Sequence, residues 1–166
     1  MDDILNNLSS LPEWDEDNFK GNEEDGEEWK TAPLKNASRD LYEQWRQVMI
    51  GINSLLASAE EDEEAAKDFW AEQKNLLFGD AYQIAVKIQS TVNAGMYVLQ
   101  MENASIIRKN AIFISGQLLS FAYQGLVEMD HAGAVRADID SFRQLFKTWI
   151  GTFNKDEFDD DWGFFV

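Results

Sequence analysis

The chain has 166 residues, of which 45% are apolar and 13% aromatic, and it carries a formal net charge of −17. This length and composition predict one globular domain with a real core and exclude a disordered chain. The absence of cysteine excludes disulfides, thiolate metal sites and cysteine nucleophiles, and the small numbers of glycine (10) and proline (2) favour helices over a turn-rich β-sandwich.

The negative charge is concentrated at the two ends of the chain. Residues 1–30 hold 11 acidic and 2 basic residues, residues 155–166 hold 5 and 1, and the residues between hold 15 and 11. Binding to phosphate backbones or to anionic membranes requires clustered Lys and Arg. We therefore expect no direct nucleic-acid binding and no membrane association. Without a transmembrane run or a signal-peptide pattern at residues 1–5, we expect a cytoplasmic location.

Residues 1–31 are predicted to form an acidic, largely irregular arm. They show no sustained period, apart from a short helical turn expected near Ile4, Leu5 and Leu8. Unlike ordinary solvating segments, which contain few aromatic residues, the arm contains Trp14, Phe19 and Trp29.

The first long helix is predicted to start near Thr31 and Pro33 and to end around Ser58. Thr31 can act as the N-cap, and proline is tolerated in a first helical turn. Apolar residues then recur at alternating steps of four and three, which indicates one buried helical face. They are Leu41, Trp45, Val48, Ile52, Leu55 and Ala59.

The second helix is predicted to span residues 61–100. The carboxylate run 60–64 suits the positive end of a helix dipole. Gly79 could divide the span into two kinked helices, with Asp80 and Gln83 as a capping box, but the apolar period continues and favours one long helix.

Two further helices complete the predicted fold. The third runs from the cap at Glu102 and Asn103 to about Glu128, and residues 129–133 form the turn before the fourth. The sequence thus predicts an all-α antiparallel four-helix bundle over residues 32–153. The fourth helix has a buried face that again steps by four and three: Val135, Ile139, Phe142, Phe146, Trp149 and Phe153.

Residues 154–166 form an acidic aromatic tail. Because a purely solubilising tail needs no exposed Trp or Phe, we interpret its end as a protein-binding segment. The order of an acidic run and then an apolar end resembles the C-terminal tail of bacterial single-stranded-DNA-binding proteins, which recruits partner enzymes. The resemblance covers about nine residues, lacks the Pro-Phe ending and does not extend to that family's barrel. The candidate binding residues are Phe158, Asp159, Asp160, Asp161, Trp162, Phe164, Phe165 and Val166.

Little in the chain points to catalysis. Glu128 and His131 have the Glu-x-x-His spacing of ferritin-like di-iron proteins, but no inward-facing Glu on the other helices completes such a site. No nucleophile motif or phosphate-binding loop is present. We expect no catalytic residues, no metal site and no cofactor.

Two basic stripes are candidate receptors for the acidic arms. They are Lys35, Arg39 and Arg46 on the first helix, and Arg136, Arg143 and Lys147 on the fourth. The combined pattern predicts a non-enzymatic adaptor or assembly subunit that binds another protein and can form oligomers. The alternatives are an acidic nucleic-acid mimic that blocks a basic groove, and a metal-binding bundle enzyme.

Overall fold

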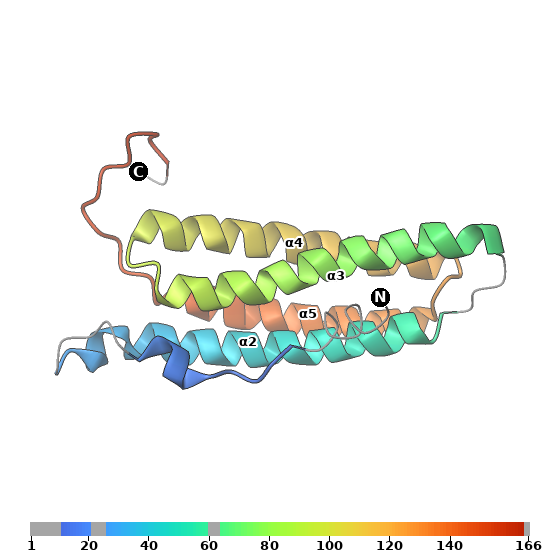
Figure 1. The fold of residues 1–166 in the computed structure, drawn as a ribbon, viewed down its shortest axis with the longest axis horizontal. Coiled ribbons are helices and arrows are strands. Elements are labelled where there is room, and N and C mark those ends of the chain that lie inside the picture. The colour runs from blue at the N-terminus through green and yellow to red at the C-terminus, as the bar shows by residue number, and fades with distance from the viewer. Residues whose placement is uncertain (1–10, 21–25, 60–63, 165–166) are drawn as a thin grey trace.

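The computed structural model describes residues 11–20, 26–59 and 64–164, and within these ranges it contains only helices and connections. A short 3₁₀ helix, η1 (Glu16–Phe19), precedes α2 (Glu28–Ala57), α3 (Glu64–Val92), α4 (Tyr97–Tyr123) and α5 (Met129–Ile150). The four long helices lie side by side, and consecutive helices run in opposite directions (Figure 1). The main contacts between the long helices follow the closed order α2–α3–α4–α5–α2. The predicted all-α four-helix bundle is confirmed.

The core is built from the periodic apolar faces that the sequence predicted. Every predicted face residue of α2 from Leu41 to Leu55, and of α5 from Val135 to Trp149, is buried. Aromatic rings connect the two helices, with the Trp45 and Phe142 centroids 4.8 Å apart. Such pairs add to the free energy gained by burying apolar area.

The prediction for the start of the first helix was wrong by one turn. Helix α2 begins at Glu28, so Pro33 lies in its second turn and Thr31 is no N-cap. Instead, the Thr31 hydroxyl donates to the Glu28 carbonyl oxygen, 3.4 Å away. Pro33 is tolerated because its fixed φ is helical and its missing amide removes one hydrogen bond near the helix end.

The predicted helix over residues 61–100 is two helices, and the break is not at Gly79. Helix α3 continues through Gly79 and ends at Val92, and α4 starts at Tyr97 rather than near Glu102. The reversal occurs at Gly95, which has a φ of +69°. That conformation is open to glycine at little steric cost, so the chain turns there although the apolar pattern continues.

The turn before the last helix also lies earlier than predicted. Helix α4 ends at Tyr123 instead of Glu128, and residues 129–133 form the first turn of α5. Gly125 has a φ of +73°, and the Leu126 amide donates to the Phe121 carbonyl oxygen at 2.9 Å. This is a Schellman ending, which pairs carbonyl groups that the helix terminus would otherwise leave free.

Buried polar contacts fix how the helices meet. The Trp45 indole donates to the Ala81 carbonyl oxygen at 2.8 Å, which links α2 to α3. Between α3 and α4, the fully buried Asn110 amide donates to Gln83 Oε1 at 2.7 Å and, more weakly, to the Asp80 carbonyl oxygen at 3.4 Å. Gln83 and Asp80 therefore serve the helix interface, in the middle of α3, and do not cap a helix.

Residues 11–20 of the acidic arm pack against α2 (Figure 1). The Trp14 ring stacks on Phe19 with centroids 4.5 Å apart and meets Tyr42 edge-on at 5.4 Å. The Tyr42 hydroxyl donates to the Pro12 carbonyl oxygen at 2.9 Å, and Glu16 pairs with Arg39 at 2.8 Å. Arg39 of the first predicted basic stripe thus receives an acidic residue of this arm.

Three predictions fall on residues that the structure does not describe. They are the helical turn near Ile4, Leu5 and Leu8, most of the carboxylate run 60–64, and the binding roles of Phe165 and Val166.

Candidate functional site

The C-terminal tail is held to the bundle by one carboxylate. Asp156 Oδ2 accepts a hydrogen bond from the backbone amide of Tyr97 at 2.8 Å, and Asp156 Oδ1 accepts one from the Phe158 amide at 3.2 Å. Tyr97 is the first residue of α4, where amides have no partner within the helix and the helix dipole is positive. Asp156 thus satisfies one free amide of this helix end, which the N-cap residue Met96 leaves without a side-chain hydrogen bond.

Beyond this anchor the tail forms a compact turn. The Gly163 amide donates to the Asp160 carbonyl oxygen at 2.8 Å, and the Phe164 amide donates to Asp160 Oδ2 at 2.9 Å. Gly163 has a φ of +68°, which favours glycine at this position. Asp160 therefore acts within the tail, and the tail is a folded element beside the start of α4 (Figure 1).

The tail aromatics remain largely in solvent. Trp162 is 93% exposed, Phe158 57% and Phe164 51%. Phe158 and Phe164 line a shallow hollow of about 350 Å³ together with Tyr97 and Val98. Of the predicted binding residues that the structure describes, two aromatics thus share one hollow, whereas Trp162 is not part of its lining.

A groove between α4 and α5 brings together all three residues of the second predicted basic stripe. It has a volume of about 620 Å³ and includes Arg136, Arg143 and Lys147 of α5 and Arg108 of α4. Asp140 is the only acidic residue in its lining. The tail turn does not line this groove. The apolar and small residues that line the groove are Ala111, Ile112, Ser115, Gly116, Ile139, Phe142, Phe146 and Ile150.

The cations of this groove differ in their partners. Arg136 Nε donates to the Ser115 hydroxyl at 3.2 Å, which connects the two helices, and Arg143 pairs with Asp140 at 3.3 Å. In the described part of the chain, Arg108 and Lys147 have no carboxylate within ion-pair distance. Two positive groups on a protein of net charge −17 are therefore open to an anionic ligand.

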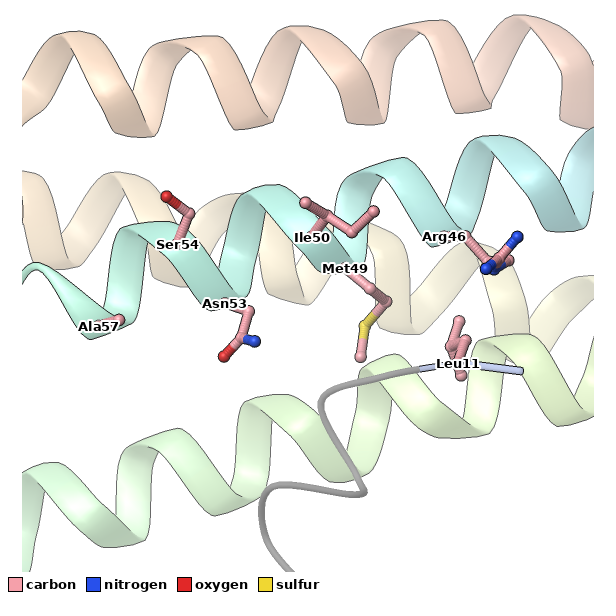
Figure 2. A pocket seen from close by; sticks show the side chains of 7 residues that line it. All are labelled: Leu11, Arg46, Met49, Ile50, Asn53, Ser54 and Ala57. Carbon is pink, nitrogen blue, oxygen red and sulfur yellow. The ribbon is translucent and has the colours of Figure 1, made fainter. Parts of the chain in front are cut away.

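A second hollow lies along α2, where the described part of the acidic arm begins. Figure 2 shows Leu11 at one end of it, close to Arg46 and Met49. Ile50, Asn53, Ser54 and Ala57 complete the lining of this hollow of about 440 Å³. The mixture of polar and apolar side chains, and the buried position of Leu11, fit a surface that receives the chain's own arm.

Glu128 and His131 lie at the start of α5, with Glu128 as its N-cap residue. Glu128 is exposed and His131 is half-buried. Within residues 11–20, 26–59 and 64–164, no group of three or more His, Asp or Glu side chains could hold a metal ion.

Two charged residues that are important for these surfaces were not identified from the sequence. Asp156 was one acid among five at the chain end, and only the fold brings it to the Tyr97 amide. Arg108 lies on a different helix from the predicted stripe, and only the packing of α4 on α5 places it in the same groove as Lys147.

None of the helices in the described part of the chain has a segment long and apolar enough to cross a membrane. Comparisons of the chain with protein families, with curated proteins and with solved structures gave no match.

Proposed function

We propose that this protein is a non-enzymatic interaction protein whose helical bundle presents the C-terminal tail to another protein. The observation that carries the proposal is the 93% exposure of Trp162 on a tail that is itself held to the bundle. Moving a large aromatic side chain from water into an apolar contact is favourable, so an exposed tryptophan can supply this free energy to binding. Trp is also the residue type most enriched among side chains that dominate binding energy.

The anchored tail supports this role for an entropic reason. A binding segment that is already ordered loses less conformational freedom when it meets its partner. Asp156 orders the base of the tail, while Phe158, Trp162 and Phe164 keep more than half of their surface available. The surrounding carboxylates keep such a surface soluble before binding and favour a partner with a basic rim.

The proposal is tested by crosslinking and affinity capture from the native cell extract with the full chain. In one variant, Trp162 and Phe164 are both changed to alanine. The matched control is Trp29→Ala, because Trp29 is also strongly exposed (71%) but lies in the first turn of α2. We expect the tail variant to lose partners that the wild type and the control retain.

Circular dichroism should show the same helix content for all three proteins, since none of the substituted side chains lies in the core. A tail variant that captures the same proteins as the wild type would contradict the proposal.

A further inference from the structure

The groove between α4 and α5 has the chemistry of a receptor for a segment that is both acidic and aromatic. We propose that it binds the C-terminal tail of a second copy of this chain. This inference rests on the proposed function, because it takes the tail as the binding segment and names one of its partners.

Charge complementarity is the first support for this occupant. Four cations and one carboxylate line the groove, and Arg108 and Lys147 have no acidic partner in the described part of the chain. The tail brings Glu157 and the run Asp159 to Asp161. Opposite charges across an interface steer the encounter and select the orientation of the bound segment.

The apolar lining is the second support. Phe142, Phe146 and Ile150 of α5 line the groove, and so do the small residues Ser115 and Gly116 of α4. A Cβ atom added to Gly116 would meet nothing within 4 Å, so the groove is open at this point. Aromatic side chains that enter such a hollow between charged rims have the arrangement of a typical protein interface.

The length of the groove agrees with the extended length of the tail. Along α5 the groove extends from Arg136 to Ile150, which is about 21 Å at the helical rise per residue. Residues 158–164 span about 24 Å when extended. One tail segment can therefore follow the whole groove and reach both its basic and its apolar parts.

The position of the tail favours a second copy over the same molecule. Its base is held at the start of α4 by Asp156, and its own turn leaves Trp162 in solvent outside the groove. A tail that extends from this anchor to a neighbour keeps the Asp156–Tyr97 hydrogen bond. Two copies that exchange tails would form a closed symmetric dimer with two identical contacts.

The test measures the molar mass of the full chain by analytical ultracentrifugation over a range of concentrations. The tail variant carries Trp162→Ala and Phe164→Ala. The groove variant carries Arg108→Glu and Lys147→Glu. The matched control carries Lys67→Glu and Lys109→Glu, which changes the net charge equally at exposed positions of α3 and α4 outside the groove.

We expect the wild type to dimerise and both the tail and the groove variants to weaken dimerisation by about 30-fold or more, as loss of central contacts does. The control should dimerise like the wild type. An equal mixture of the two weakened variants should recover a heterodimer, because one intact tail then meets one intact groove. Added salt should weaken the wild-type dimer by screening the exposed charges.

A wild-type chain that stays monomeric would overturn the inference, and so would a dimer that the groove variant leaves intact. If the tail variant alone dissociates the dimer, the tail binds at another surface, and the proposed function stands while the groove assignment fails. If the chain is monomeric but the capture experiment still shows tail-dependent partners, only the second-copy inference fails.

Discussion

The indole Nε1 of Trp149 donates a hydrogen bond to the hydroxyl oxygen of Ser38, 2.9 Å away, and neither side chain has solvent-exposed surface. The two residues connect α5 to α2 deep in the core. Ser38→Ala leaves a buried indole N–H without an acceptor, and we expect a loss of about 1–3 kcal/mol in the free energy of unfolding. Urea denaturation measures this loss.

The control for this prediction is Ser141→Ala, because Ser141 is exposed and bonds only within its own helix. If Ser38→Ala is as stable as this control, the indole has found another acceptor and the contact does not hold the two helices together.

Asp156 is predicted to stabilise α4 and to order the tail at the same time. Asp156→Ala removes the acceptor for the Tyr97 amide, and we expect a loss of about 1 kcal/mol, as for other lost N-terminal caps. Hydrogen exchange should become faster at the Tyr97 amide, and limited proteolysis should cut the tail sooner. Asp159→Ala removes the same charge without this hydrogen bond, so unchanged exchange in both variants would argue against the anchor.

Two glycines should respond to alanine in opposite directions. Gly79 is helical and a Cβ there meets nothing within 4 Å, so Gly79→Ala should raise the free energy of unfolding by about 1 kcal/mol. Gly125 has a positive φ. Gly125→Ala should therefore lower the free energy of unfolding by about 1–2 kcal/mol, because alanine is strained in the left-handed conformation. If both substitutions shift the melting temperature in the same direction, the result contradicts the placement of the turns.

The hydroxyl of Tyr42 should make stability depend on pH in the alkaline range. Burial raises its pKa above the ordinary value of 10.0, although Arg46 acts in the opposite direction. Above about pH 10 the unfolded chain releases this proton while the folded chain retains it. The contribution of Tyr42 to the free energy of unfolding is therefore fully present below this pH. It is lost as the pH rises through the folded-state pKa of Tyr42.

Tyr42→Phe removes this proton, so its free energy of unfolding should fall less between pH 9 and pH 11 than that of the wild type, although it lacks the hydrogen bond to Pro12 at every pH. The exposed Tyr123→Phe serves as control. Parallel pH profiles for wild type and Tyr42→Phe would exclude Tyr42 as the cause.

The sequence was sufficient to predict the helices and their buried faces, but not the positions of the turns. A buried face with steps of three and four is a property of many residues together, so the buried faces of α2 and α5 were predictable residue by residue. A turn depends on which glycine adopts a left-handed conformation. Gly79 and Gly95 lie in the same apolar pattern, yet Gly79 is helical and Gly95 is left-handed, and the pattern does not distinguish the two.

The tail and groove show the same limit. The order and spacing of residues indicated an acidic aromatic end and a basic stripe on the last helix. That Asp156 reaches the Tyr97 amide, and that Arg108 joins Lys147, depends on which helices are neighbours. Contacts of this kind need the assembled bundle and cannot be derived from the spacing of residues within one helix.

The hydrogen bonds of Asn110 have a consequence for the alignment of α3 and α4. Smooth apolar faces can slide past each other by one helical turn, about 5.4 Å, and still bury similar areas. Any such slide would carry Gln83 and the Asp80 carbonyl oxygen away from the buried amide and leave its N–H groups unpaired. One asparagine therefore selects a single register between two helices whose apolar contacts alone would allow several.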